Sequence, residues 1–275
     1  MSMTLRTHNQ RSKVALLIIC LALALIPIYA LAQHQAPFVI ISDTHIRTET
    51  NSVYSAFLQK IEKEKINQII HVGDAINTPG SASQWTQFLE LTGPDKTLHL
   101  TPGNHDIRGD KSLTVYLHFF QKPYYSFSDG DTLFVFLNTE LPGEEGKIAG
   151  EQFVWLKAEL EKAFKYKFVF LHEPLYPFIP GHGLDKYTKA RDGLHRLFVS
   201  KGVSLVVSGH DHIYGRATKD NILYVTVATL GGQIPPYMIR SEVFRHIITT
   251  RNGEGYSFNV RDMEGNIKDR FIVSR

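Results

Sequence analysis

Five short, mainly apolar runs in this chain each end in aspartate, asparagine or histidine, and this recurrence constrains the fold more than any other feature. The runs lie at residues 38–41, 69–72, 98–100, 168–171 and 205–208. Short apolar runs of this kind are typical of strands that are buried on both faces, and such strands need a covering layer on each side. We therefore expect these five strands to lie inside an α/β protein.

The segments around these runs predict the covering layers. Apolar residues recur at helical spacing in three sets: Val53, Phe57 and Ile61; Phe153, Leu156, Leu160 and Phe164; Ala190, Leu194 and Leu197. Alternating or β-rich stretches predict further strands at 124–138, 222–228, 243–250, 256–260 and 271–274. No repeat or linker divides residues 36–275, so we expect one domain over 33–275 with an α/β fold, a layered β-sandwich of two mixed sheets flanked by helices.

Residues 1–32 are typical of an export signal. A basic start is followed by an apolar segment at 14–26, the helix breaker Pro27 and a small-residue pattern that ends at Ala32. We expect cleavage after Ala32 and an exported protein, either periplasmic or extracellular. The alternative is an uncleaved N-terminal membrane anchor, because the apolar segment together with its flank approaches the ~20 residues that span a bilayer.

Charge and cysteine content narrow the possible partners. The chain has 30 Lys and Arg against 27 Asp and Glu, and removing residues 1–32 leaves 27 of each sign. A neutral processed chain gives no strong signal for nucleic-acid binding. The single cysteine, Cys20, lies inside the export signal. Any metal bound by the processed chain must therefore be held by nitrogen and oxygen ligands.

The residues that follow the five runs offer one set of metal ligands. In open α/β sheets, ligands gather outside the carboxyl ends of the strands, where loops direct side chains into one crevice. Taken singly, each motif could be an ordinary turn, a helix cap or a loop histidine, but five in this order favour a common site. The expected ligands are Asp43, His45, Asp74, Asn104, His172, His210 and His212.

This series of motifs resembles the signature of the calcineurin-like metallophosphoesterase superfamily. The motifs are Asp43-x-His45, Gly73-Asp74, Gly103-Asn104-His105-Asp106, His172 and Gly209-His210-x-His212. The resemblance implies a four-layer fold with a binuclear metal centre at one end. It also implies that one metal is bound by Asp43, His45, Asp74 and His212 and the other by Asp74, Asn104, His172 and His210, so that Asp74 bridges them.

The resemblance also implies the chemistry of the centre. Two cations ~3.5–4 Å apart neutralise phosphate oxygens and convert a bridging water into a hydroxide nucleophile. Imidazole and carboxylate ligands suit Mn, Fe or Zn, so we expect two metal ions of these kinds. The purple acid phosphatase branch carries a tyrosine three residues after the Gly-Asp aspartate, whereas this chain carries Asn77. An iron-tyrosinate centre is therefore not expected.

His105 and Asp106 are the expected catalytic residues. His105 would donate a proton to the leaving alkoxide, and Asp106 would orient it or tune its acidity. In the alternative interpretation, His105 only positions the phosphate. Asn104, His105 and Arg47 are expected to contact the substrate, and Arg108 is a further candidate for a phosphate contact.

Two loops are candidates for the wall of the substrate pocket. The first, at 173–185, contains Tyr176, Phe178 and His182, and the second, at 231–240, contains Pro235, Pro236 and Tyr237. Both are expected on the side of the sheets where the metal ligands lie.

The expected function is metal-dependent hydrolysis of a small-molecule phosphomonoester or phosphodiester. Asn77-Thr78 and Asp106 depart from the protein Ser/Thr phosphatase branch, which has Asp-Arg and glutamate at these places. The alternatives are a cyclic-nucleotide or phospholipid phosphodiesterase and a non-catalytic metal-binding relative. The natural substrate and the oligomeric state stay open.

Overall fold

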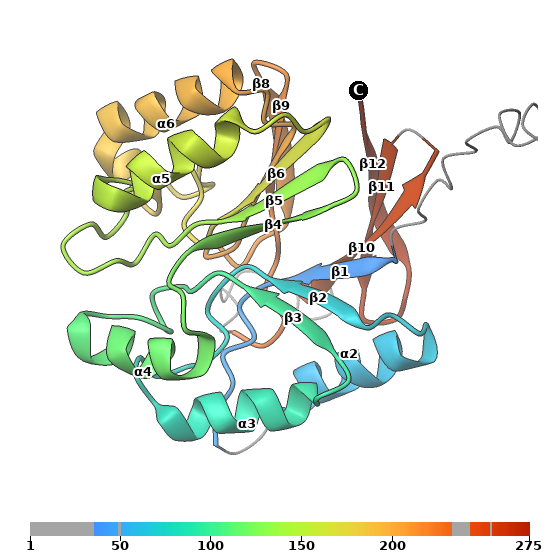
Figure 1. The fold of residues 1–275 in the computed structure, drawn as a ribbon. Helices are drawn as coiled ribbons and strands as arrows, with labels where there is room; N and C mark the ends of the chain where they lie inside the picture. Colours follow the sequence, from blue (N-terminus) through green and yellow to red (C-terminus); the bar gives the residue numbers. More distant parts are fainter. Residues whose placement is uncertain (1–35, 49–50, 233–242, 254) are drawn as a thin grey trace, which may run out of the picture. The chain divides into compact units, whose positions relative to one another are not determined.

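A computed structural model describes residues 36–48, 51–232, 243–253 and 255–275. The expected export signal lies outside these residues, as do Pro235, Pro236 and Tyr237 of the second expected pocket loop. Within the described residues, the strands form two six-stranded mixed sheets (Figure 1).

The first sheet has the strand order β12-β11-β10-β1-β2-β3. Strands β1, β2 and β3 run parallel, while β10 pairs antiparallel with β1 and continues into an antiparallel meander. The bounds are β1 Phe38–Ile41, β2 Gln68–His71, β3 Thr97–Leu100, β10 Arg245–Asn252, β11 Gly255–Asp262 and β12 Ile267–Ser274.

The second sheet has the strand order β4-β5-β6-β7-β9-β8. Its central strands β5, β6, β7 and β9 are parallel, and an antiparallel strand closes each edge. The bounds are β4 Tyr125–Asp129, β5 Thr132–Phe136, β6 Tyr166–Phe170, β7 Leu205–Ser208, β8 Gly215–Lys219 and β9 Ile222–Thr226.

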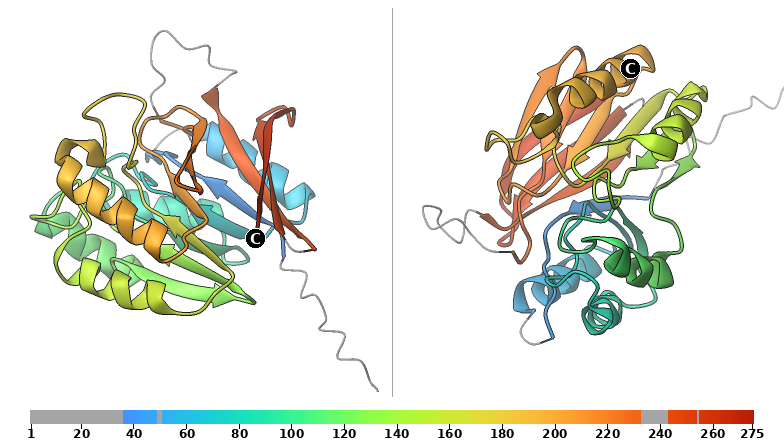
Figure 2. Two further views of the ribbon diagram at one scale, coloured as in Figure 1. Left: turned by 90° about the horizontal axis from the view of Figure 1, so that it is seen from above. Right: turned by 90° about the vertical axis from the view of Figure 1, so that its left-hand side faces the viewer.

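Helices cover the outer face of each sheet, which gives four layers (Figure 2). Helices α2, α3 and α4 pack on the first sheet, and α5 and α6 pack on the second. The bounds are α2 Ser52–Lys63, α3 Ala82–Thr92, α4 Asp110–Phe120, α5 Gly150–Glu161, the 3₁₀ turn η1 Leu184–Tyr187 and α6 Thr188–Ser200.

Strand periodicity divides the apolar residues between the layers. In β1, Phe38 and Ile40 enter the core between the two sheets, while Val39 and Ile41 pack against the helices. The central core is rich in phenylalanine, and Phe136 stacks on Phe170 with ring centroids 4.9 Å apart. Because both faces of the central strands are buried, their sequences read as continuous apolar runs.

The expected fold class is confirmed, but some elements were not predicted. The five strands that precede the polar motifs and the three helices with apolar spacing are present. Phe164 lies beyond the end of α5 and packs from a loop. Helices α3 and α4 and the edge strand β8 had no prediction.

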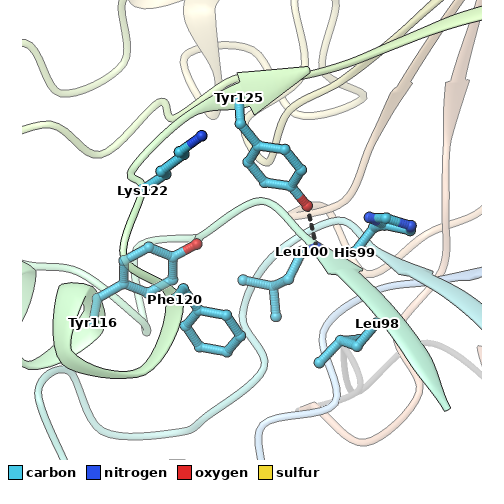
Figure 3. Close-up of a pocket in the computed structure, with 7 residues that line it drawn as sticks. All are labelled: Leu98, His99, Leu100, Tyr116, Phe120, Lys122 and Tyr125. Atoms are coloured by element: carbon cyan, nitrogen blue, oxygen red, sulfur yellow. Dashed lines mark hydrogen bonds between the residues drawn. The ribbon is translucent and has the colours of Figure 1, made fainter. Parts of the chain in front are cut away.

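The edges of the two sheets meet beside α4 around a cavity of about 240 Å³ (Figure 3). Its lining residues are Leu98, His99, Leu100, Tyr116, Phe120, Lys122 and Tyr125. The Tyr125 hydroxyl accepts a hydrogen bond from the Leu100 N–H at 3.1 Å, which links β4 of one sheet to β3 of the other. None of the expected metal ligands lines this cavity.

Among the described residues, no helix combines the length and the apolar character needed to cross a membrane.

Candidate metal centre

Polar side chains from both sheets meet beyond the C-terminal ends of β1, β2, β3, β6 and β7. The sequence places Asp43 and His45 after β1, Asp74 after β2 and Asn104 after β3. His172 follows β6, and the turn after β7 carries two further histidines. The structure brings all seven expected ligand residues together, and that they bind metal stays a prediction.

The first group contains Asp43, His45, Asp74 and His212, whose ligand atoms all lie within 4.8 Å of one another. The two Nε2 atoms of His45 and His212 are 3.2 Å apart. Asp43 Oδ1 lies 3.3 Å from His212 Nε2, and Asp74 Oδ2 lies 3.6 Å from His45 Nε2. Four donors thus point at one small volume.

The second group contains Asp74, His172 and His210, which meet the same 4.8 Å limit. His172 Nε2 is 3.4 Å from Asp74 Oδ2 and 3.1 Å from His210 Nδ1. The amide oxygen of Asn104 joins this group at 3.3 Å from His172 Nε2. Because Asp74 belongs to both groups, the arrangement agrees with the bridging position that the resemblance implies.

Five of these residues have left-handed backbone conformations. The φ angles are 53° at Asp43, 45° at His45, 56° at Asp74, 71° at His210 and 58° at His212. Such φ values are uncommon outside glycine, and they cluster where tertiary structure imposes them at functional sites. The tight turns after β1, β2 and β7 therefore direct these side chains to the centre at some cost in backbone energy.

Glycines allow the loops to approach the ligand side chains closely. A Cβ atom on Gly103 would collide with Asp74 and His172. A Cβ atom on Gly209 would collide with Ser42 and would lie only 2.7 Å from Asp43 Oδ2. The glycines that precede Asn104 and His210 thus leave room for the ligands of the neighbouring strands.

The two buried carboxylates are held in their ionised form by the surrounding imidazoles. Burial raises the pKa of Asp43, but the close His212 imidazole and the charge of His172 together outweigh burial and lower the pKa to about 2. For Asp74, the charge of His172 and the hydrogen bond to it likewise outweigh burial, so the pKa lies well below the usual range. Ionised carboxylates are the form that metals bind.

The histidines differ among themselves in their proton affinity. Burial lowers the pKa of His45 to about 4, and burial with the charge of His172 lowers that of His210 to about 2. Burial also acts on His172, but the neighbouring Asp74 carboxylate outweighs it and raises the pKa well above 6.5. A cation bound by Asp74 and His172 would replace the imidazolium proton of His172.

The donor set fits two divalent or trivalent cations. Asp43 Oδ1 is buried and has no hydrogen-bond partner, as expected for an oxygen that ligates a cation. The Nδ1 atom of His172 lies 2.9 Å from the Val72 carbonyl oxygen, and donation to this oxygen leaves Nε2 directed at the centre. With imidazole, carboxylate and amide donors and no thiolate, the site suits Mn, Fe or Zn.

His105 lies at the edge of the first group, outside the two sets of ligand atoms. Its ring meets the ring of His45 edge to face at 4.6 Å. Its backbone N–H donates to Asp74 Oδ1 at 2.8 Å, and its Nδ1 lies 2.7 Å from the carbonyl oxygen of Asn77. Donation from Nδ1 to this carbonyl leaves Nε2 available to a substrate.

Asp106 does not contact His105 in the way the sequence suggested. Its carboxylate is fully buried and accepts hydrogen bonds from the backbone N–H groups of Ile76 and Gly103, at 3.0 and 2.8 Å. These bonds join the loops after β2 and β3. The His105 ring is held instead by the carbonyl oxygen of Asn77, and a part for Asp106 in tuning His105 stays a prediction.

The two candidate arginines differ in their position. Arg47 Nε donates to the side-chain oxygen of Asn77 at 3.2 Å, which places Arg47 next to the residue that holds His105. Arg108 is exposed, and its backbone N–H donates to Ser112 Oγ at the start of α4. Of the two, Arg47 is thus tied to the site by its side chain.

Several supporting residues were not predicted. Gln84 at the start of α3 accepts hydrogen bonds from the backbone N–H groups of Asn77 and Thr78, at 3.0 and 2.8 Å. His71 shares a 2.9 Å hydrogen bond with Thr44, whose hydroxyl donates to the Ala75 carbonyl. The pattern Ser81-x-x-Gln84 is a helix-start signal that could have revealed the first of these.

Known proteins with similar sequences are named phosphatases. The chain is 28% identical over 161 residues to the serine/threonine-protein phosphatase CPPED1 of Bos taurus, and the match covers 54% of this chain and 51% of that protein. The Homo sapiens protein of the same name is 28% identical over 151 residues, covering 50% and 48%. The chain thus spans about half the length of the curated relatives it matches.

Solved structures of low sequence identity share the fold. Purple acid phosphatase PPD1 from yellow lupin superposes with a TM-score of 0.69 and 18% identity, covering 87% of this chain and 54% of that chain. GAP50, the anchor in the inner membrane complex of Plasmodium, gives 0.68 and 15%, covering 88% and 89%. A dimetal phosphatase from Danio rerio gives 0.63 and 14%, covering 88% and 99%.

The family model for calcineurin-like phosphoesterases matches residues 36–214, the part of the chain that contains all seven expected ligands. This match confirms the resemblance inferred from the motifs. The chain belongs to the calcineurin-like phosphoesterase family.

Proposed function

We propose that the protein hydrolyses phosphoesters with two bound metal ions of the Mn, Fe or Zn type. The observation that carries this proposal is the sharing of Asp74 between two adjacent donor groups, one with His45 and the other with His172. Two donor groups that share one carboxylate suit a pair of neighbouring cations better than a single ion. The family match, in a family of phosphoester hydrolases, supports the same conclusion.

The bound cations would neutralise the phosphate oxygens and acidify the attacking water. The chain supplies the remaining functions. Asp74 sets the spacing of the two positions, and Asn104 contributes a neutral oxygen beside His172. Arg47, exposed near the site, offers a positive charge to the incoming phosphate.

His105 is the proposed proton donor to the leaving alkoxide. The Asn77 carbonyl fixes its ring through Nδ1, so Nε2 is the atom that would face the leaving oxygen. We assign Asp106 a structural part in this step, since it ties the His105 loop to the loop after β2. A proton donor placed in this way contributes about 10²–10⁴-fold to turnover.

A small-molecule phosphomonoester or phosphodiester is the proposed substrate class. A phosphoserine or phosphothreonine protein is the second candidate, and the similarity to proteins named serine/threonine-protein phosphatases favours it. Asn77, Thr78 and Asp106 depart from the motifs of the protein Ser/Thr phosphatase branch. These departures favour the small-molecule substrate.

The deciding experiment measures metal content and turnover together. Purified protein loaded with Mn²⁺, Zn²⁺ or Fe would be tested on 4-nitrophenyl phosphate, bis(4-nitrophenyl) phosphate and a phosphoserine peptide. We expect Asp74→Asn to lose both metal pairing and turnover. His105→Ala should keep its metals and should hydrolyse the phosphoserine peptide, the alkyl ester among the three substrates, ~10²–10⁴-fold more slowly. Equal loss of metal in both variants would contradict the division of roles.

A non-catalytic relative is the main alternative in a different functional class. It predicts that two metals bind and that none of the three substrates is hydrolysed with any of the metals. GAP50, a structural neighbour described as an anchor, illustrates that this fold is also found in proteins described by other roles.

Export is also a proposal. It is supported by the basic start, the apolar segment and the small-residue pattern of residues 1–32. The mass of the mature protein from its native host would show cleavage after Ala32, whereas an intact N-terminus in the membrane fraction would favour the anchor.

A further inference from the structure

The segment between β6 and α6 exposes apolar side chains beside the candidate metal centre. Of the large apolar side chains that are exposed in the described part of the chain, Phe178, Ile179 and Tyr187 all belong to this segment, with exposed fractions of 51%, 41% and 45%. Single exposed apolar residues need no explanation, but Phe178 and Ile179 are adjacent on a loop whose His182 ring stacks on an expected ligand, His210, and such residues are candidates for ligand contact.

Asp211 holds this segment against the turn that carries two of the expected ligands. Its carboxylate is buried, with one oxygen 2.8 Å from His182 Nδ1 and the other accepting the Phe178 backbone N–H at 2.8 Å. Asp211 itself lies between His210 and His212 in the sequence. One buried carboxylate therefore fixes two points of the loop relative to the metal ligands.

Two side chains of the segment pack on that turn and on the start of β8, which follows it. The His182 ring stacks on the His210 ring, with centroids 4.1 Å apart and planes 21° apart. The Phe178 ring lies against Gly215, where any side chain would collide with it. We call the surface formed by Phe178, Ile179 and His182 the apolar wall.

The loop is also braced internally, so the apolar wall does not depend on ligand to take shape. The His182 N–H donates to the Ile179 carbonyl at 3.0 Å, and the Leu184 N–H donates to the Pro174 carbonyl at 3.0 Å. Asp185 accepts the Gly181 N–H at 2.6 Å. A preformed surface of this kind adds affinity at little ordering cost.

The apolar wall and His105 lie beside different groups of expected ligands. His105 contacts His45, which belongs to the first group, whereas His182 contacts His210, which belongs to the second. The departing alcohol belongs beside the proton donor. A substituent at the apolar wall is therefore one that stays on the phosphorus, and a phosphomonoester has no such substituent.

We propose that the substrate is a phosphodiester whose retained substituent is apolar and lies on the apolar wall, which Asp211 positions. This inference rests on the proposed phosphoesterase function and names the substrate class for the same site. The family resemblance leaves the choice between monoester and diester open. The contacts of Asp211 and His182 favour the diester, because they hold the apolar wall beside the second group and not beside His105.

The test keeps the leaving group constant and varies the retained one. Methyl, butyl and hexyl 4-nitrophenyl phosphate all release 4-nitrophenolate, so differences in kcat/KM report on the retained chain. A fully buried methylene contributes about fourfold, and partial burial at an exposed wall corresponds to about twofold. We expect kcat/KM to rise about 30-fold from methyl to hexyl, and 4-nitrophenyl phosphate to be the poorer substrate.

Variants of the wall sharpen the assignment. Phe178→Ser should reduce the methyl-to-hexyl ratio to about threefold or less. The matched control is Val154→Ser, which removes an apolar side chain that is 63% exposed on α5, and it should keep the full ratio. An unchanged methyl-to-hexyl ratio in Phe178→Ser would contradict the proposal that the apolar wall binds the retained substituent.

Asp211 is a positioning residue, and a conservative variant tests it. Asp211→Ala should lose the chain-length ratio while metal content, measured alongside, stays at two per chain. Asp211→Asn should recover part of the ratio, because its amide oxygen still accepts the Phe178 N–H. Retention of the full ratio in Asp211→Ala would show that Asp211 does not position the wall.

A binding measurement separates this inference from the proposed function. Calorimetry with methyl, butyl and hexyl methylphosphonate on the metal-loaded protein should show a Kd that falls with chain length. If no ester is hydrolysed but Kd falls, the proposed function fails and the apolar wall stands. If esters are hydrolysed while kcat/KM and Kd are independent of chain length, or if the monoester is the better substrate, the inference is overturned.

Discussion

Two regions of the molecule bury histidines, and the groups around each histidine determine whether its pKa is raised or lowered. His172 in the candidate centre and His246 on β10 are both fully buried. The Asp74 carboxylate raises the pKa of His172 well above 6.5, whereas burial lowers that of His246 to about 4. His246 packs edge to face on Phe57, and neither of its ring nitrogens has a hydrogen-bond partner. Burial therefore dominates at His246, whereas the adjacent Asp74 carboxylate outweighs burial at His172.

The largest expected effect concerns stability linked to metal. At free metal about 100-fold above Kd, each occupied position adds about 2.7 kcal/mol to the free energy of unfolding, so two positions add about 5 kcal/mol. Urea unfolding with and without Mn²⁺ or Zn²⁺ should show this increase in the wild type and in His246→Leu. Asp74→Asn should lose most of it. An equal increase in Asp74→Asn would remove the distinction between the two regions.

The next effect is acid sensitivity at His246. Its folded-state pKa of about 4 lies below the unfolded value of 6.5, so the unfolded chain takes up the proton first as the pH falls. Its contribution to stability is complete above pH 6.5 and is lost between pH 6.5 and 4, by about 3 kcal/mol in total. The loss of stability between pH 7.5 and 4.5 should therefore be about 2–3 kcal/mol smaller in His246→Leu than in the wild type.

His99 offers a weaker version of the same test. Burial lowers its pKa to about 4, and its ring stacks on Phe127 with centroids 4.1 Å apart. Because His99 is only partly buried at the sheet edge, we expect His99→Leu to reduce the acid sensitivity by about 1–2 kcal/mol, in the same direction as His246→Leu. A larger effect at His99 than at His246 would contradict the ranking by burial. Unfolding at pH 4.5 and 7.5 measures both.

The smallest effect is expected at Tyr125. Tyr125→Phe removes the acceptor of the Leu100 N–H beside the cavity and should cost about 1 kcal/mol of unfolding free energy at any pH between 4.5 and 7.5. A pH-dependent loss would mean that Tyr125 acts through its neighbour His99. Tyr124→Phe is the control, because it removes the hydroxyl of the preceding residue, which does not accept the Leu100 N–H.

The strands and the ligands could be predicted because each follows from local pattern. An apolar run such as 38–41 needs a covering layer on both faces, and Asp43 follows it at the end where parallel strands present their loops. Helix α5 was visible from its apolar spacing. The repeated placement of glycine before a polar residue, as in Gly103-Asn104, reflects the crowding that the structure shows at the centre.

The remaining features depend on contacts between segments that are distant in the sequence. Asp106 was read as a partner of its neighbour His105, but its carboxylate bonds to Ile76, thirty residues away. The carbonyl that does hold His105 belongs to Asn77, and a backbone atom leaves no mark in the sequence. Helix α4 escaped prediction because its apolar residues, from Leu113 to Phe120, surround much of the helix and blur the helical spacing.

The donor groups also draw on both halves of the sandwich. The first sheet contributes the carboxylates Asp43 and Asp74, while His172, His210 and His212 come from loops of the second. A chain that has folded only its N-terminal half would thus present acidic groups without most of their imidazoles. Under the proposed function, binding of a pair of cations would therefore require that the two sheets have already docked.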